Sequence, residues 1–318
     1  MTDIDVLDEA LTRLHATGPE YEGYLCNHGP MVADALVRMG RAEAVEKWVN
    51  GYLPRLEDPP AVRWGLTEAY APQALGQVDR VGDWCALFDL LLREEPWTDV
   101  LVRWWPRLLP SAVTAAAHPL IRTGHVVRAL REQESEPRLA ELAQALGYWA
   151  ARWQPLRAEA EPSVPLLDLP VVTATGTFQE RLEQLGLAPT GPADLNAIVE
   201  EAVAGYLTWG ANNPVMLVHA ATAPRAASLV MPSLPVDLWE ATRAIARSVT
   251  ATVVMAYRTD EPPPAPLSFP SSADDVTDQA VANGDEHAIK FTEVALESSA
   301  RGCGVALPAA ALACDLLE

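Results

Sequence analysis

The apolar residues of this chain recur every three or four positions, and this spacing constrains the fold more than any other feature. Such a repeat places apolar side chains on one face of an α-helix, whereas a strand needs a period of two, which is scarce here. The helical repeat is clear in residues 3–15, 31–40, 83–94, 137–153, 195–210, 236–258 and 286–300. With 318 residues and 49% hydrophobic content, the chain can bury a sizeable core. The sequence therefore predicts an all-α protein.

Residues typical of helix ends stand beside several of these segments. Asn27, Asn213 and Asp285 are expected N-caps, because their side-chain oxygens can accept hydrogen bonds from the first backbone N–H groups of a helix. Pro214 is expected at a first helical position, and Gly40 just past a helix end.

Two segments interrupt the helical pattern. Residues 154–178 and 259–285 are rich in proline and small polar residues, so each is expected to be a long connection. Either segment could be a domain linker or a loop over an active site. We favour loops on a single domain spanning residues 1–318, because the histidines of interest lie on both sides of each segment.

The charge of the chain limits its partners. A formal net charge of -20 and a pI near 4.6 argue against nucleic acid and anionic membranes, which attract clustered Lys and Arg. Residues 1–18 are acidic and amphipathic, unlike an export signal, and no apolar run reaches the roughly 18 residues of a membrane-spanning helix. We expect a soluble, cytoplasmic protein. The cysteines show no CxxC spacing and are expected to be free thiols: Cys26, Cys85, Cys303 and Cys314.

Three of the six histidines stand in unusual settings. His28 lies at an expected helix entrance beside glycine, and His118 precedes Pro119, which biases it out of the helical region and makes it a hinge. His219 is expected in the middle of a helix among small apolar residues, where its ring needs a hydrogen bond or a metal. His125 follows His118 by seven residues and shares its face if one helix is continuous. A single helical histidine is nevertheless more often an ordinary core or surface residue than a ligand.

Lys290 is one of only two lysines, the other being Lys47, among 23 Lys and Arg residues. It follows His287 by three residues, so both side chains are expected on one helix face. On a solvated face Lys290 would simply pair with Glu293. If it faces inward, burial favours a neutral, nucleophilic amine. Such an amine can add carbon dioxide to form a carbamate, which is an anionic oxygen ligand for a metal.

Several familiar motifs are absent. The sequence contains no HExxH, no zinc-finger spacing, no GxGxxG, no GxxxxGK[ST] and no GxSxG. Spacing alone therefore proves neither a metal site nor a phosphate-binding loop. The missing dinucleotide motif and the lack of strands together exclude a flavin-dependent oxygenase of the usual type.

Four histidine-containing motifs resemble those of the questin oxidase-like family, which occurs in fungal aromatic polyketide pathways and in many bacteria. In order, they are "NHGPMVADALVRMG", "AAHPLIRTGHVVRAL", "LVHAATAPRA" and "DEHAIKFTE". No single motif is specific, but the four occur in register over almost the whole chain. The chain is shorter than the fungal members of the family.

The resemblance implies an oxygen-dependent, flavin-independent oxidoreductase of secondary metabolism. Its relatives open the central ring of anthraquinones, in a Baeyer–Villiger-like manner as monooxygenases or in a dioxygenase manner, and NADPH would serve as an external reductant of the quinone. In a characterised branch of the family, a non-haem iron is held by four histidines and a carboxylated lysine. Carried over motif by motif, the ligands in this chain are His28, His118, His219, His287 and Lys290.

The chemistry of this donor set fits several metals. Neutral imidazoles suit Fe, Zn, Cu or Ni, and a carbamate adds one hard anionic oxygen. Five protein ligands leave one octahedral position, where Fe(II) could pass an electron to oxygen, whereas Zn(II) could only activate water. A zinc-dependent hydrolase and a non-catalytic helical binding protein therefore remain alternatives to the iron oxygenase.

Other residues are candidates for supporting roles. His125 could be a base beside the ligands or an alternative ligand, and Arg122 could bind a phenolate or the carbamate, or form a structural salt bridge. Asp285 and Glu293 are candidates to orient the ring of His287, which metal-bound histidines usually require. An aromatic substrate would need an apolar cleft, for which the ten tryptophans offer stacking surfaces.

Overall fold

The computed structural model describes residues 3–156, 158–160, 164–185, 188–190, 194–259 and 272–317. Helices dominate this part of the chain, and its strands pair only as β1 with β2 and β3 with β4. The prediction of an all-α fold is confirmed. The contacts within the chain group into two compact units, one formed by Met1–Leu156 with Leu229–Trp239 and the other by Arg157–Ser228 with Glu240–Glu318.

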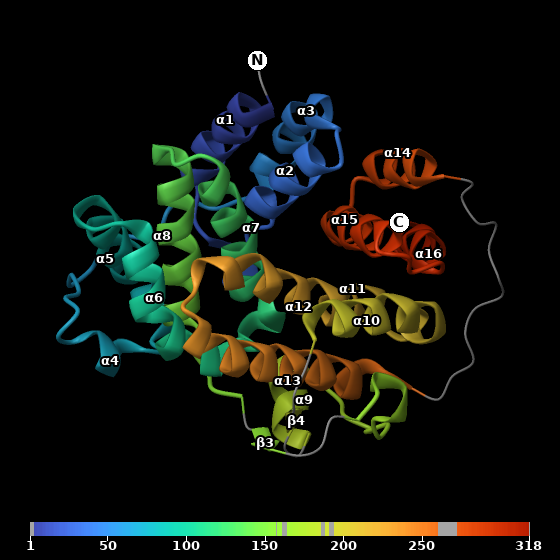
Figure 1. Cartoon of the computed structure of the whole chain (residues 1–318). Coiled ribbons are helices and arrows are strands. Elements are labelled where there is room, and N and C mark those ends of the chain that lie inside the picture. Colours follow the sequence, from blue (N-terminus) through green and yellow to red (C-terminus); the bar gives the residue numbers. More distant parts are fainter. Residues whose placement is uncertain are drawn as a thin grey trace. The chain divides into compact units, whose positions relative to one another are not determined.

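The first unit contains the N-terminal helices (Figure 1). Its elements are α1 (Asp3–His15), β1 (Glu20–Tyr21), β2 (Leu25–Cys26), α2 (Gly29–Arg38), α3 (Ala42–Tyr52), α4 (Ala71–Ala74), α5 (Val81–Glu94), α6 (Trp97–Leu108), α7 (His118–Glu132) and α8 (Glu136–Ala151). Helix α8 packs against α5, α7 and α1, while α2 packs against α1, α3 and α7. This arrangement places the starts of α2 and α7, each with a candidate histidine, in one packed unit.

Large aromatic side chains fill the core of the first unit. Trp84 stacks on Phe88, and both meet the edge of Trp104, with ring centroids 5.0–6.0 Å apart. Trp105 and Trp149 form a second edge-to-face pair at 5.6 Å. Burial of one such ring contributes about 1.5–3 kcal/mol. The tryptophans that could have formed a substrate cleft are thus largely core residues in this unit.

The second unit contains most of the C-terminal helices (Figure 1). Its elements are β3 (Ala158–Ala160), α9 (Phe178–Gln184), β4 (Ala188–Thr190), α10 (Leu195–Trp209), α11 (Pro214–Leu217), α12 (His219–Val230), α13 (Trp239–Tyr257), α14 (Ala273–Asn283), α15 (Glu286–Ala300) and α16 (Ala306–Leu316). The division between the units falls near the end of α12 and the start of α13. Helix α15 packs against α10, α14 and α16, and Tyr206 of α10 lies against Phe291 of α15 with centroids 4.6 Å apart.

Most of the predicted helix ends are confirmed. Asn213 caps α11, which begins at Pro214, and Asp285 caps α15. Gly40 adopts φ +71 just past the end of α2. Asn27 is one residue too early to be the N-cap of α2, because His28 occupies that position, so this prediction is wrong. The Asn27 side chain instead accepts a hydrogen bond from the backbone N–H of Gly29, at 3.0 Å.

The predicted loop over 259–285 is wrong in its second half. Residues Ala273–Asn283 form α14, which Ser272 caps by accepting a hydrogen bond from the Asp275 backbone N–H at 3.1 Å. Residues 260–271 lie outside the described part of the chain. In the earlier segment, 154–178, the described residues include β3 and a short 3-10 turn at Leu166–Asp168. The assignment of one domain to residues 1–318 stays a prediction.

The four cysteines are free thiols, as expected, with Cys26 and Cys314 buried and Cys85 and Cys303 half-buried. Within the part of the chain that the structure describes, no helix combines the length and the apolar character needed to cross a membrane.

Candidate functional site

The four candidate histidine ligands share one feature: each stands at the start of a helix. His28 is the N-cap residue of α2, His118 and His219 are the first residues of α7 and α12, and His287 is the second residue of α15. The N-terminal end of a helix carries a partial positive charge, which disfavours a protonated ring. Metal ligation requires the neutral imidazole, so these positions suit metal ligands.

His28 and His118 face each other within the first unit. Their Nε2 atoms lie 2.7 Å apart, and the rings meet edge to face with centroids 4.6 Å apart. His118 Nδ1 lies 2.6 Å from the carbonyl oxygen of Ala115, which assigns the proton to Nδ1 and the lone pair to Nε2. Two nitrogens about 2.1 Å from one ion and at right angles are about 3 Å apart. A small opening of the pair would therefore admit an ion.

A left-handed turn sets the direction in which α7 starts. Ala115, Ala116 and Ala117 have φ values of 47, 55 and 65, a region that costs about 1–2 kcal/mol for each residue with a Cβ atom. His118 itself is helical, at φ -55 and ψ -42. The prediction that Pro119 drives His118 out of the helical region is therefore wrong. Proline is accommodated in the first turn of a helix, where its missing N–H is not needed, and the change of direction falls on the three alanines.

His219 and His287 lie together in the second unit. Their rings meet edge to face with centroids 5.4 Å apart. His219 Nδ1 is 3.1 Å from the carbonyl oxygen of Met216, and His287 Nδ1 is 3.5 Å from a carboxylate oxygen of Asp285. Like His118, both rings thus turn Nδ1 toward an oxygen just before their own helix. Oxygens of this kind fix the tautomer and orientation of metal-binding histidines.

The expectation that His219 lies in the middle of a helix is wrong. Helix α11 ends at Leu217, and α12 begins at His219 after the single residue Val218. The break gives His219 a position in a first helical turn, and the carbonyl of the preceding helix provides the hydrogen bond that its buried ring requires.

Lys290 lies one turn after His287 in α15, and only 1% of its surface is exposed. It is therefore not on a solvated helix face. Burial lowers the pKa of His287, and the neighbouring charge of Lys290 lowers it further, whereas Asp285 opposes the shift. Burial alone would raise the pKa of Asp285, but the nearby ring of His287 and hydrogen bonds from the backbone N–H groups of His287 and Ala288 lower it. Asp285 is thus an ionised group that can orient His287. Glu293 is buried in the same helix, and its role in orienting His287 stays a prediction.

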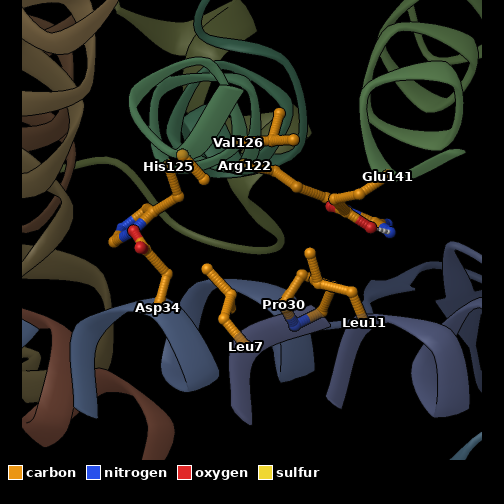
Figure 2. Close-up of a pocket in the computed structure, with 9 residues that line it drawn as sticks. Leu7, Leu11, Pro30, Asp34, Arg122, His125, Val126 and Glu141 are labelled. Carbon is orange, nitrogen blue, oxygen red and sulfur yellow. Dashed lines mark hydrogen bonds and ion pairs between the residues drawn. The ribbon is translucent and has the colours of Figure 1, made fainter. Parts of the chain in front are cut away.

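His125 does not join the pair formed by His28 and His118. The seven residues between His118 and His125 span about 10.5 Å of the continuous helix α7. His125 Nδ1 lies 2.8 Å from a carboxylate oxygen of Asp34 in α2, and Arg128 donates to the same carboxylate. Figure 2 shows His125 turned toward Asp34. A catalytic role for His125 stays a prediction.

Asp34 is the charged centre of this contact. Burial alone would raise its pKa, but the guanidinium of Arg128, the hydrogen bond to His125 and the charge of Arg38 hold it well below its usual range. The sequence motifs predict no role for Asp34. The available signal was a carboxylate between apolar residues on both faces of the segment 31–40.

Arg122 forms a buried ion pair with Glu141 of α8. Its Nη2 donates to Glu141 Oε2 at 2.6 Å and to Gln144 Oε1 at 2.8 Å, and its Nε donates to the second carboxylate oxygen. Burial alone would lower the pKa of the Arg122 guanidinium. The charge and the hydrogen bonds of the adjacent Glu141 carboxylate together have the larger effect and raise this pKa above its usual value. A small cavity lined by Leu7, Leu11 and other residues lies beside this pair (Figure 2). The structural salt bridge is thus present, whereas binding of a phenolate or carbamate by Arg122 stays a prediction.

Comparison of the sequence with models of protein families and with curated proteins finds no match. The function proposed below therefore rests on these residues and their geometry.

Proposed function

We propose that this protein is a non-haem iron-dependent oxygenase that opens the ring of an anthraquinone-type aromatic polyketide. The ion would be held by His28, His118, His219, His287 and Lys290, the last as a carbamate formed with carbon dioxide. The main support is the common setting of the histidines: each starts a helix, and three of them turn Nδ1 toward a local oxygen. The proposal requires all five side chains to reach the same ion.

The donor set fits this metal. Imidazole nitrogens and an anionic oxygen are suitable ligands for Fe(II), which when bound supplies the electron that activates dioxygen. The ring of His287 needs no proton removed before it can act as a ligand at neutral pH, because burial lowers its pKa. Lys290 is buried, and burial disfavours the charged ammonium form of a lysine relative to the neutral amine. Conversion to a carbamate would replace that cation by an anion able to face a metal.

The residues around Lys290 and His287 in α15 favour a neutral lysine amine and an oriented histidine ring. Ile289 and Phe291 flank Lys290 and are fully buried, so bulk water is excluded from this part of α15. A water-excluded amine is more readily neutral and therefore more nucleophilic toward carbon dioxide. The carboxylate of Asp285 lies 3.5 Å from His287 Nδ1, a position from which it would orient the ring.

The substrate class comes from the resemblance of the four motifs. Ring cleavage by dioxygen requires an electron-rich aromatic ring, which is the reduced hydroquinone form of an anthraquinone. NADPH is proposed as the external reductant of the quinone and not as a tightly bound cofactor.

Two experiments test the proposal. The first is anaerobic titration of metal-free protein with Fe(II) and with Zn(II), comparing the wild type with His219→Ala and with His15→Ala, in which an exposed histidine is removed as a control. We expect Fe(II) binding in the wild type and in His15→Ala, and its loss in His219→Ala. Equal binding by His15→Ala and His219→Ala would contradict the ligand assignment.

The second experiment measures the reaction itself. The iron-loaded protein is incubated with a hydroxyanthraquinone, NADPH and ¹⁸O₂, and the products are analysed by mass spectrometry. We expect a ring-opened acid that carries ¹⁸O, with one or two labelled atoms distinguishing a monooxygenase from a dioxygenase. Hydrolysis of an ester by zinc-loaded protein without oxygen uptake would favour the hydrolase, and absence of metal binding would favour a non-catalytic helical protein.

A further inference from the structure

Helices α2 and α7 both begin at the histidine pair and run in the same direction. The first contact between them is His28 with His118, and the second is Asp34 with His125 and Arg128. The second contact lies six residues along α2 and seven along α7, which correspond to about 9 and 10.5 Å of helix. The two helices therefore advance together from one contact to the next.

A third contact follows at the ends of the same helices. Arg38, the last residue of α2, pairs with Glu132, the last residue of α7, and also donates to Asp34 at 3.2 Å. We call the three contacts the α2–α7 ladder. From the second contact to the third, α2 advances by four residues and α7 by seven. The long side chain of Arg38 spans the extra length.

The contacts of the ladder oppose an axial slide of α2 along α7. The positive N-terminal ends of the two helices lie side by side and repel each other, which disfavours this arrangement of the two dipoles. The charged contacts add to the apolar packing, because each of them joins one particular residue of α2 to one particular residue of α7. Packed helices are known to move past each other in such one-turn steps. A slide of this size, about 5.4 Å, would separate the Nε2 atoms of His28 and His118.

The second contact of the ladder opposes the slide most strongly. Asp34 is 2% exposed and its carboxylate accepts from His125, Arg128 and Arg38 at once. Moving α2 along α7 would separate the buried carboxylate of Asp34 from the partly buried guanidinium of Arg128, which is strongly unfavourable. The third contact is weaker, because the side chain of Glu132 is 43% exposed and solvent screens the pair.

We propose that Asp34 is a positioning residue, which locks α2 and α7 in the register that brings His28 Nε2 to His118 Nε2. Asp34 touches neither ring of the pair and acts through the two helices. The proposal concerns the histidine pair in metal-free protein. It can therefore fail while the proposed iron oxygenase stands, and it can hold if the pair binds another metal or none.

The test reads the pair directly. Histidine is labelled selectively with ¹⁵N, so that only six residues contribute signals. The scalar coupling between the two Nε2 atoms, transmitted through the hydrogen bond that joins them, is measured by NMR in metal-free protein near neutral pH. Asp34→Asn is compared with the wild type and with Glu132→Gln, which removes the exposed carboxylate from the same ladder.

We expect the coupling in the wild type and in Glu132→Gln, and its loss in Asp34→Asn while the far-UV circular dichroism spectrum stays helical. A helical Asp34→Asn protein that keeps the coupling would overturn the proposal, as would a wild type without the coupling. If Asp34→Asn fails to fold, Arg128→Gln is measured in its place, because it breaks the same contact from α7. Loss of the coupling in folded Arg128→Gln supports the proposal, and its retention overturns it.

Discussion

Removing the carboxylate of Glu141 should destabilise the protein more than any surface substitution. Glu141 pairs with Arg122 through both carboxylate oxygens, and the two side chains are only 5% and 1% exposed. In Glu141→Gln the guanidinium stays buried and charged without its counter-charge. Breaking a buried pair in this way costs about 3–5 kcal/mol. Because glutamine and Gln144 can still accept hydrogen bonds from Arg122, we expect a loss near the lower limit, about 3 kcal/mol.

The measurement is urea-induced unfolding followed by far-UV circular dichroism, with the free energy of unfolding extrapolated to water. The matched control is the double variant Arg122→Met with Glu141→Leu, which removes both charges and keeps similar volumes. Because an apolar pair often replaces a buried ion pair without loss, we expect the double variant to be more stable than Glu141→Gln. A loss below about 1 kcal/mol in Glu141→Gln, or a double variant less stable than the single one, would refute this reasoning. The double variant also tests Arg122 in the reaction, since a folded protein without ring-opening activity would support a catalytic role.

Three further predictions concern other parts of the fold. The pKa of Asp34 is far lower in the folded state than in the unfolded chain, so its stabilising effect is complete above about pH 5 and decreases progressively as the pH falls below about 4. Thermal unfolding of Asp34→Asn between pH 7 and 3 should therefore depend less on pH than that of the wild type, and parallel profiles would contradict this. Ala115→Gly should stabilise the protein by about 0.5–1 kcal/mol, because glycine adopts the left-handed conformation of this turn without strain. Ala112→Gly, at a helical φ of -60, should destabilise the protein by about 1 kcal/mol. Thermal denaturation that ranks the two variants the other way would refute the proposed backbone strain at Ala115. Burial raises the pKa of the Cys314 thiol to about 11, so iodoacetamide at pH 8 should modify half-buried Cys303 first, as peptide mass spectrometry can show, and prior modification of Cys314 would refute the assignment.

Local sequence patterns were sufficient to predict most of the helices. The apolar repeat of three or four residues reports directly on which face of a helix is buried, and the caps at Asn213 and Asp285 report on where helices begin. The pattern failed for α14, which is acidic and carries a weak apolar stripe after a proline-rich segment. Two residues do indicate this helix, namely Ser272 at its N-cap and Gly284 at its C-cap. A prediction based on the proline and small polar residues of the whole segment overlooks them.

The candidate site was predictable only in part. Sequence spacing shows that His287 and Lys290 share a helix face, because residues three positions apart in one helix point to the same side. It cannot show that His28 meets His118, or that Asp34 meets His125, since these contacts join helices that are some 90 residues apart in the chain. The left-handed turn before His118 was also hidden, because alanine has no preference for that conformation and gives no signal for it.

The most direct test of the central claim is the metal content of protein purified without oxygen and with bicarbonate present. Lys290→Ala and His219→Ala are compared with the wild type and with Lys47→Ala, which removes the other lysine of the chain from an exposed position. We predict about one iron per chain in the wild type and in Lys47→Ala, and a sharp loss in Lys290→Ala and His219→Ala. Zinc in place of iron, no metal in any sample, or unchanged iron in Lys290→Ala would contradict the proposed oxygenase site.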